Sequence, residues 1–501
     1  MDIAPKVPAT RRGTWMRAAL GLARCAPVVL LAAAAGAQSQ QGAAEPNPTI
    51  FLGVQRSAFA AREGPAGPVP RTADEKPDLS GIWNGQRALP GQPGPLMLPW
   101  AQKLTEEREG RHSADDLEAR CLPGGPPRAA PYHYQIVQTP KLVLMLFEGN
   151  IHSYRQFFLD GSDHPKDLKP TWYGDSRAHW DGDTLVVDTV GFTDKSWIDM
   201  AGHPHTTGMH LIEKFHRRTY GTLEIENLID DPGTYQKPWV QKRISSLETD
   251  PNLDMTEYVC NENNQDPGHL FGSTATMPGG TKEEIPMAGP VRRPPPAPKG
   301  PAPRRADGKV DLSGMWVLAG RPELPGDPSY QPWAQKTYEE RKAAHGRGDP
   351  ENQCLPDGVP RVNALPYKFV QTDKLLVVLP EGNTRAFRRI FLDGRGHAKD
   401  LDDDPRWSGD SIGRWEGDTL VVDTMGFNDR AWLDSTGKPH SDALHVTARY
   451  RRPDLGHLDV QYTLEDSKAF TRPYSFSRVF TLAPNWEIRE YICMERLVFH
   501  E

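Results

Sequence analysis

Two copies of one eleven-residue stretch decide the fold of this 501-residue chain. The stretch GDTLVVDTVGF (residues 182–192) returns as GDTLVVDTMGF (residues 417–427), with ten of the eleven residues identical. Earlier in each copy, PDLSGIW (residues 77–83) returns as VDLSGMW (residues 310–316). The shift between the copies is 233 residues for the earlier motif and 235 residues for the later one. Self-similarity at this scale indicates a tandem duplication of one domain.

Apolar residues within each copy follow the two-residue period of β-strands. In the first copy, runs rich in β-forming residues lie at residues 142–147, 153–159, 184–189, 210–217 and 223–229. Short turn signals such as Asp-Gly separate the runs, which predicts successive antiparallel hairpins. We therefore expect an all-β protein of two tandem antiparallel β-meander domains, each a lipocalin-like barrel. A β-sandwich is the alternative.

One short helix is expected in each domain, after the repeated motif PWAQK. The helical pattern covers residues 101–119 in the first copy and residues 334–344 in the second. The remainder is poor in helix because the chain holds 48 prolines, and proline lacks the backbone donor that a helix interior requires. The composition therefore argues against a helical bundle.

Composition also places the domain boundaries. Residues 273–309 hold nine prolines and many basic residues, which favours an extended, semi-rigid spacer. The predicted organisation is a signal peptide at 1–37, a disordered or extended linker at 38–76, a first β domain at 77–272, the proline-rich linker at 273–309 and a second β domain at 310–501.

The amino terminus has the pattern of a secretory signal. Arg11, Arg12 and Arg17 precede the apolar residues 26–35, and a small-x-small site then predicts cleavage before Gln38. This pattern predicts a periplasmic or secreted protein. The net charge of −7 offers no attraction for nucleic acid, and no apolar run approaches the roughly 18 residues of a membrane-spanning helix.

Four cysteines lie at matching positions in the two copies. Cys121 and Cys260 are separated by 139 residues, as are Cys354 and Cys493. Three pairings of four cysteines are possible, and duplication favours the one in which each copy carries its own bridge. A metal or redox site is the alternative, but the chain has no CxxC motif.

Five tryptophan pairs are retained between the copies. They are Trp83 and Trp316, Trp100 and Trp333, Trp172 and Trp407, Trp180 and Trp415, and Trp197 and Trp432. Core packing explains many of them, because tryptophan buries a large apolar area. Aromatic residues that line a barrel also bind flat apolar ligands, and we predict this role for Trp172, Trp180, Trp407 and Trp415.

Several polar residues recur at aligned positions in the two copies. The histidines among them could support general acid–base chemistry, since histidine titrates near neutral pH. In this hypothesis His164 or His205 transfers protons, Asp175 orients them and Arg155 holds an anionic group. The second copy supplies the counterparts His397, His440, Asp410 and Arg388. Turn capping is the alternative for the acids.

Other chemistries have less support in the sequence. His164, His205 and His210 would supply three imidazoles to a zinc ion, but the spacing alone does not bring them together. Ser176 and Ser411 follow a Gly-Asp pair, yet a hairpin rather than a helix follows each serine. The chain contains no GxSxG, HExxH, P-loop or GxGxxG motif. We therefore predict no cofactor and no bound metal.

The motifs WxGDTLVVDTxGF, CLPxGxPR (residues 121–128 and 354–361) and DLSGxW give the chain a family resemblance. The sequence resembles an uncharacterised family of exported bacterial β-rich proteins, present here as a tandem duplication. The resemblance implies export and a β-rich domain, and it implies no activity and no catalytic residue.

Three functional hypotheses follow from the sequence. The first is an exported tandem β-barrel protein that binds a small apolar or aromatic molecule in the periplasm. The second is an isomerase, lyase or hydrolase that uses His/Asp/Glu acid–base chemistry, and the third is an envelope interaction module. The sequence leaves the ligand, the question of enzymatic activity and the oligomeric state open.

Overall fold

The computed structural model describes residues 61–149, 153–251, 253–262, 293–382 and 386–495. All of them belong to one compact unit of the chain. The predicted signal peptide at 1–37, the first part of the predicted linker at 38–76 and residues 273–292 of the proline-rich linker lie outside the described residues.

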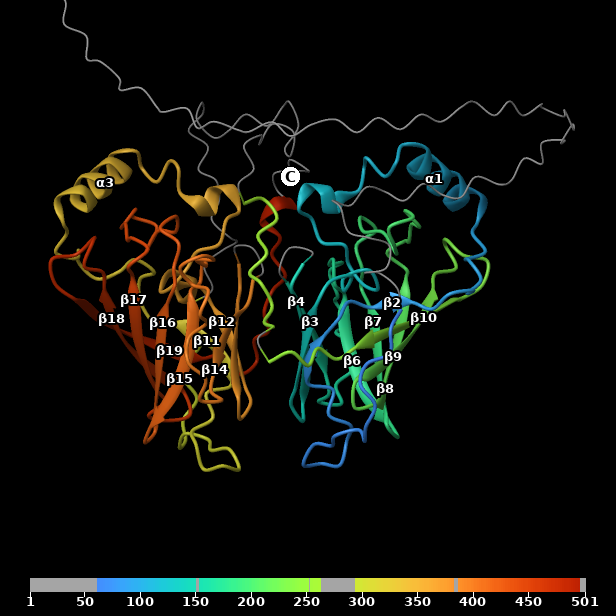
Figure 1. The fold of residues 1–501 in the computed structure, drawn as a ribbon, viewed down its shortest axis with the longest axis horizontal. Coiled ribbons are helices and arrows are strands. Elements are labelled where there is room, and N and C mark those ends of the chain that lie inside the picture. Colours follow the sequence, from blue (N-terminus) through green and yellow to red (C-terminus); the bar gives the residue numbers. More distant parts are fainter. Residues whose placement is uncertain (1–60, 150–152, 252, 263–292, 383–385, 496–501) are drawn as a thin grey trace, which may run out of the picture. The chain divides into compact units, whose positions relative to one another are not determined.

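The first copy forms a strongly curved ten-stranded sheet, here called barrel 1 (Figure 1). Its strands are β1 (Gly81–Trp83), β2 (Arg87–Ala88), β3 (Tyr134–Gln138), β4 (Leu142–Phe147), β5 (Tyr154–Phe158), β6 (Asp175–Asp181), β7 (Thr184–Val190), β8 (His210–Thr219), β9 (Thr222–Asp230) and β10 (Trp239–Ser246). The order in the sheet is β1-β3-β4-β5-β6-β7-β8-β9-β10-β2. An isolated bridge between Trp83 and Leu247 brings the two ends of the sheet together.

The second copy forms a closed nine-stranded barrel, here called barrel 2. Its strands are β11 (Gly314–Leu318), β12 (Tyr367–Gln371), β13 (Leu375–Pro380), β14 (Arg388–Phe391), β15 (Asp410–Glu416), β16 (Thr419–Met425), β17 (His445–Arg451), β18 (His457–Glu465) and β19 (Tyr474–Leu482). The prediction of two tandem β-barrel domains is thus confirmed, and the sandwich alternative falls because β11 pairs with both β12 and β19.

Each barrel has one α-helix beyond one end of its strands, α1 (Pro99–Gly110) and α3 (Pro332–Ala343) (Figure 1). The described residues also contain the short 3₁₀ helices η2 (Leu117–Arg120), η3 (Pro350–Gln353) and η4 (Arg361–Ala364). The first helix is shorter than the predicted 101–119. It ends at Gly110, and Asp116 then accepts a hydrogen bond from the backbone N–H of Glu118 at the start of a separate 3₁₀ turn.

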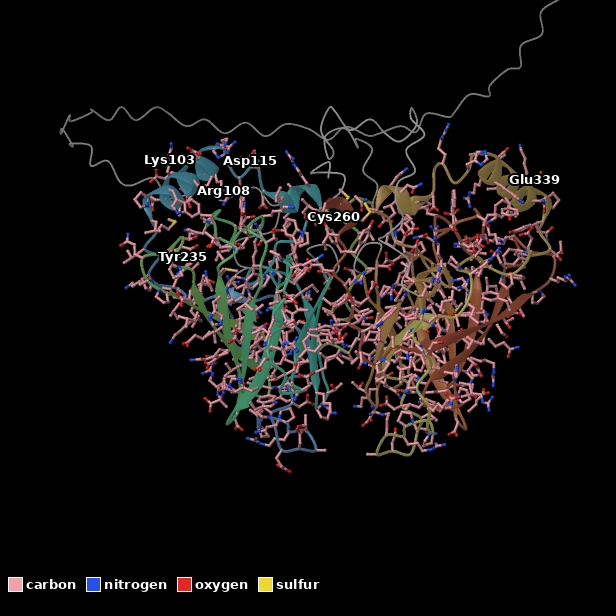
Figure 2. The ribbon with its side chains drawn as sticks, turned by 180° about the vertical axis from the view of Figure 1, so that it is seen from behind. Lys103, Arg108, Asp115, Tyr235, Cys260 and Glu339 are labelled. Carbon is pink, nitrogen blue, oxygen red and sulfur yellow. A yellow bond between two sulfur atoms is a disulfide. The ribbon has the colours of Figure 1, made fainter. Side chains whose placement is uncertain are left out.

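Tryptophan and arginine side chains fasten α1 to barrel 1. The Trp100 indole N–H donates to the carbonyl of Gly233 at 2.9 Å, and Arg108 donates to the carbonyl of Gly202 at 2.6 Å. Figure 2 shows Arg108 on α1. Its guanidinium lies 4.4 Å from the ring centre of Trp197. Since α3 repeats these contacts through Trp333, Arg341 and Trp432, two of the retained tryptophan pairs have a structural role.

One neighbouring pair in each sheet departs from the antiparallel pattern. β5 pairs with β6 in parallel, and β14 pairs with β15 in parallel. A long connection, residues 159–174 in barrel 1, must therefore return the chain to the end at which β5 begins. This connection brings His164 beside the first residue of β6.

The strands alternate as the sequence pattern predicts. On β7, Leu185 and Val187 are fully buried in the barrel 1 core, whereas Thr184 and Asp188 lie on the outer face. β4 and β13 are exceptions because every residue of both strands is buried. Their outer faces belong to one apolar cluster that includes Leu144 and Val377, so the two barrels share a third core.

The segment after the last strand of each copy packs against the other barrel. The Glu257 carboxylate, which follows β10, accepts a hydrogen bond from the backbone N–H of Trp407 at 2.6 Å. In return, Glu490, which follows β19, accepts from the backbone N–H of Trp172 at 2.6 Å. We call residues 247–262 and 483–495 the exchanged tails.

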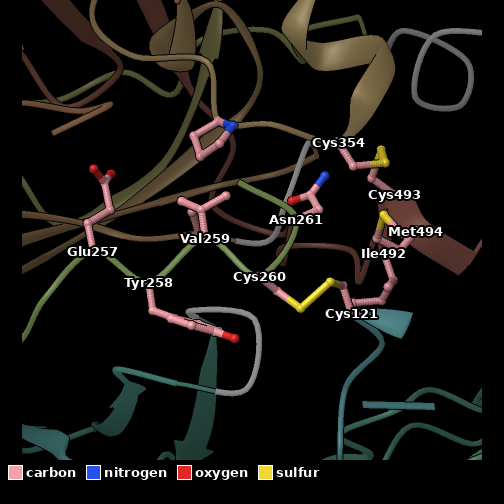
Figure 3. Close-up of a pocket in the computed structure, with 12 residues that line it drawn as sticks. Cys121, Glu257, Tyr258, Val259, Cys260, Asn261, Cys354, Ile492, Cys493 and Met494 are labelled. Carbon is pink, nitrogen blue, oxygen red and sulfur yellow. A yellow bond between two sulfur atoms is a disulfide. The ribbon is translucent and has the colours of Figure 1, made fainter. Parts of the chain in front are cut away.

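Both exchanged tails carry a cysteine that bonds to its own copy. Cys121 pairs with Cys260 and Cys354 pairs with Cys493, as the sequence predicts. The two bridges line one small pocket (Figure 3). Among the described residues, no helix is both long enough and apolar enough to cross a membrane.

Candidate functional site

One polar group lies on the outer face of barrel 1, where four side chains alternate between acid and base. The chain Asp175, His164, Asp188 and His210 is here called the outer His–Asp cluster. His164 Nδ1 lies 2.7 Å from Asp175 Oδ1, and its Nε2 lies 3.3 Å from Asp188 Oδ1. His210 Nε2 lies 2.7 Å from the same Asp188 oxygen.

Three adjacent strands position this cluster. Asp175 begins β6, Asp188 lies on β7 and His210 begins β8, all with outward-facing side chains. Gly174 makes the turn before Asp175 possible: its φ is +67°, and a Cβ atom there would lie 2.8 Å from the carbonyl oxygen of Val190. The repeated Gly-Asp-Ser sequence therefore serves a backbone turn into a strand rather than a nucleophilic serine.

The second copy reproduces the cluster with Asp410, His397, Asp423 and His445. The corresponding distances are 2.8, 3.3 and 2.6 Å. The arginine that supports the first carboxylate differs between the copies. Arg177 binds Asp175 from β6, whereas Arg406 reaches Asp410 from the preceding loop.

Each ring nitrogen of His164 faces a carboxylate oxygen. A protonated His164 donates from both nitrogens, to Asp175 on one side and to Asp188 on the other. The accessible end of the cluster is Asp188 and His210, whose side chains are 41% and 39% exposed. Within the described ranges, no group of three or more histidine, cysteine, aspartate or glutamate side chains is placed to hold a metal ion.

His205 and His440 lie elsewhere and are buried. His205 donates from Nδ1 to the carbonyl of Thr206 at 3.1 Å, so its Nε2 accepts from the Ser196 hydroxyl at 2.8 Å. Burial lowers the pKa of both histidines, which favours the neutral ring. The structure thus brings together His164 with Asp175 and His397 with Asp410, but it places His205 and His440 in separate hydrogen-bonded positions.

Arg155 points into barrel 1, away from the outer His–Asp cluster. It forms a two-pronged ion pair with Glu213, at 3.1 and 2.6 Å, and both side chains are at most 3% exposed. The charge of this carboxylate also acts on a second buried arginine, Arg243 on β10. Burial lowers the pKa of Arg243, and the charges of Asp199 and Glu213 oppose that shift.

The same position in barrel 2 has no carboxylate. Arg388, the counterpart of Arg155, donates to the hydroxyls of Ser411 and Thr424 at 2.9 Å each. Ala448 stands where barrel 1 has Glu213. The Arg388 Nη1 atom is buried and has no hydrogen-bond partner among the described residues.

Further unpaired polar atoms lie inside barrel 2. Arg478, the counterpart of Arg243, has a buried Nη1 without a partner in the described part of the chain, as has the hydroxyl of Tyr367. The hydroxyls of Tyr450 and Tyr462 lie near each other without a well-formed hydrogen bond. Burial raises the pKa of Tyr462 well above its ordinary value, and the charges of Arg478 and Arg388 oppose the rise.

A pocket of about 740 Å³ lies beside β11 and β19 of barrel 2. It is lined by residues 318–326 and 477–479, which include Arg478. The last backbone bond between these segments runs from Ala319 N–H to the carbonyl of Val479, and the chain then leaves the barrel wall. In barrel 1 the corresponding position is covered by β2, which pairs with β10.

The four tryptophans predicted to bind a ligand lie outside this pocket. Trp172 and Trp407 are buried and receive the carboxylates of the exchanged tails. Trp180 and Trp415 are partly buried and pack against the cores of barrels 1 and 2. Their contact with a ligand stays a prediction.

Sequence reasoning left several of these residues out of the candidate site. The acid–base hypothesis did not use Asp188 or His210, and His210 was considered as a zinc ligand, although both residues are retained in the second copy. The carboxylates of the exchanged tails carry a signal that was overlooked, because Glu-Tyr-Val-Cys at residues 257–260 returns as Glu-Tyr-Ile-Cys at residues 490–493. Tyr450 and Tyr462 carry no such signal, since the first copy has Phe215 and Asn227 in their place.

The fold and the buried polar groups define a duplicated β-barrel protein. No protein-family model matches the chain, and no curated protein matches it. A search of solved structures returns a protein provisionally described as a thioesterase II from Thermobifida fusca YX, at 12% identity over 56% of this chain and 74% of that chain. Its TM-score of 0.09 carries no argument about fold or function.

Proposed function

We propose that this protein binds a small molecule with an apolar or aromatic body, and that barrel 2 is the copy that binds it. The pocket of about 740 Å³ beside Arg478 is the observation that carries the proposal. Its volume falls in the range of small-molecule sites, which combine apolar walls with a few placed polar groups. Leu318 and Leu324 supply apolar wall, and Arg478 is a charged residue in the lining.

A fluorescence titration with 1-naphthol tests this function. We expect a saturable change in tryptophan emission that fits one site per chain. Ala319 is exposed and lines the pocket, so Ala319→Trp fills the site with little effect on folding and weakens binding at least about tenfold. The matched control is Ala88→Trp, at an exposed alanine on β2 of barrel 1, which leaves binding unchanged. Equal effects of the two variants, or a titration that never saturates, contradict the proposal.

The outer His–Asp cluster favours an acid–base enzyme as the second candidate. Its specific support is that His164 lies between two carboxylates and that His397 repeats the arrangement at nearly the same distances.

A double substitution, His164→Ala with His397→Ala, tests the second candidate. If the cluster transfers protons, hydrolysis of p-nitrophenyl acetate falls by about 10²- to 10⁴-fold, the usual contribution of a general acid or base. Substitution by asparagine at both positions is the control for folding, because its amide keeps a donor for the neighbouring carboxylate. Turnover that survives both pairs of substitutions removes the cluster from catalysis.

We propose that the protein works outside the cytoplasm, in the periplasm or after secretion. The two disulfides support this location, since such bridges persist in oxidising compartments. The predicted signal at residues 1–37 points the same way.

A further inference from the structure

We infer that the ligand of barrel 2 carries a carboxylate, which enters between Arg388 and Arg478 and takes the place that the Glu213 carboxylate holds in barrel 1. The inference rests on the proposed function, because the carboxylate would belong to the molecule bound in the pocket. It adds a chemical class to that molecule, a small organic acid.

One buried position that differs between the two copies is Glu213 in barrel 1 and Ala448 in barrel 2. In barrel 1, one buried carboxylate binds Arg155 directly and acts electrostatically on Arg243. The second copy retains both arginines, as Arg388 and Arg478, but replaces the glutamate by Ala448. Two buried guanidinium groups have therefore kept their positions while their shared carboxylate is absent.

Among the described residues, no acid pairs with Arg388 as Glu213 pairs with Arg155. The neighbours of Arg388 that accept its hydrogen bonds are the uncharged hydroxyls of Ser411 and Thr424. The charge of Asp434 opposes the lowered pKa of Arg478, as that of its counterpart Asp199 does for Arg243, yet Asp434 is bound to Lys438 at 2.9 Å. Burial of an uncompensated charge is costly, so an incoming anion is strongly favoured at this position.

The unpaired groups match the needs of a carboxylate. Its two oxygens accept several hydrogen bonds, and an arginine can bind both at once. Arg388 Nη1 and Arg478 Nη1 are free to donate, and the hydroxyls of Tyr367 and Tyr462 lie in the same buried region. Tyr462 lies directly opposite Ala448 in the β17–β18 pair but makes no hydrogen bond to Arg388, so it does not replace the missing acid.

The route to this position is the pocket beside Arg478. Arg478 lines the pocket, where its Nη2 donates to the carbonyl of Pro322, and its Nη1 belongs to the buried group. The apolar body of the ligand would occupy the pocket, and its acid group would pass inward along Arg478.

Binding of acetate to the full chain tests the inference, with acetamide as the uncharged probe of the same shape. The measurement is a ¹³C-acetate NMR titration at constant ionic strength. We expect one acetate per chain and at least about tenfold weaker binding of acetamide, the difference that a charge-assisted hydrogen bond makes. Ala448→Glu supplies the missing carboxylate from within and reduces acetate affinity more than about tenfold. Inorganic phosphate, titrated in parallel, binds more weakly than acetate.

The variants Ala448→Glu and Ala448→Gln, together with the 1-naphthol titration, distinguish failure of the carboxylate site from failure of the proposed function. Ala448→Gln has the size of the glutamate without its charge, and thermal unfolding monitored by circular dichroism shows whether each variant is folded. Equal binding of acetate and acetamide, equal loss in the Gln and Glu variants, or tighter binding of phosphate overturns the carboxylate site. If 1-naphthol still binds in that case, the proposed function stands alone, whereas acetate binding without 1-naphthol binding supports an anion site and removes the proposed function.

Discussion

Glu213→Ala lowers the free energy of unfolding by about 3–5 kcal/mol, the usual loss when one partner of a buried ion pair is removed. The large effect is expected because the Arg155 and Glu213 side chains are only 3% and 2% exposed. Without the glutamate, Arg155 keeps only hydroxyl partners, from Ser176 and Thr189 at 3.3 Å. Equilibrium unfolding in urea, followed by tryptophan fluorescence, measures the change.

A double substitution gives the control for this prediction. Arg155→Met combined with Glu213→Leu removes both charges and keeps most of the side-chain volume, so it costs far less than the single change. The prediction is contradicted if the single variant is as stable as the original protein, or if the double variant is no more stable than the single one. In either case the ion pair with Arg155 does not explain why barrel 1 has a glutamate at position 213.

Much of the fold was predictable because the strands obey local rules. The runs at residues 142–147 and 184–189 became β4 and most of β7, since alternating or continuous apolar residues bounded by Gly and Asp turns fix strand position locally. The parallel pairing of β5 with β6 was not predictable in this way. A strand's direction relative to its neighbour depends on how a long connection returns, and the residues 159–174 carry no local signal for that.

The candidate site was also predictable only where local sequence was enough. His164 and Asp175 could be selected together because both copies retain them, and the structure brings them within 2.7 Å. Asp188 joins them only through the register of β6 and β7, in which Arg177 lies opposite Asp188. The sequence comparison revealed that Glu213 has no acidic counterpart in the second copy. The partner of Glu213 is the residue that faces inward at the same height in a nearby strand. The sequence does not give the relative heights of the strands, so it could not identify Arg155 as that partner.

The contacts of the exchanged tails with the opposite barrel were not predictable from the sequence repeat. A disulfide within each copy suggested two self-contained domains, and the cysteine pairing is correct. The residues just before each second cysteine nevertheless bind the other barrel, through Glu257 and Glu490. Contacts between duplicated domains depend on their outer surfaces, and an internal repeat describes each copy separately.

Reduction of both disulfides destabilises the protein by up to about 5 kcal/mol per bridge, because each bridge joins cysteines 139 residues apart and restricts a long loop of the unfolded chain. The loss also reaches the other barrel, because each bridge holds a tail whose glutamate binds a tryptophan backbone there. Urea unfolding with and without dithiothreitol measures the effect, and a thiol assay confirms that four additional thiols appear on reduction. Unchanged unfolding of the fully reduced protein would contradict the prediction.

A pair of substitutions separates the bridges from the tails that they hold. Glu257→Gln with Glu490→Gln keeps both disulfides but replaces each charge-assisted hydrogen bond by a neutral one, which costs about 1–2 kcal/mol at each site. Cys121→Ser with Cys260→Ser removes one bridge and leaves both glutamates in place. Because the loop-closure effect acts on the unfolded chain, the cysteine variant loses more stability than the glutamine variant. The reverse order would mean that docking of the exchanged tails, rather than the covalent bridges, supplies the larger share of the stability of this duplicated fold.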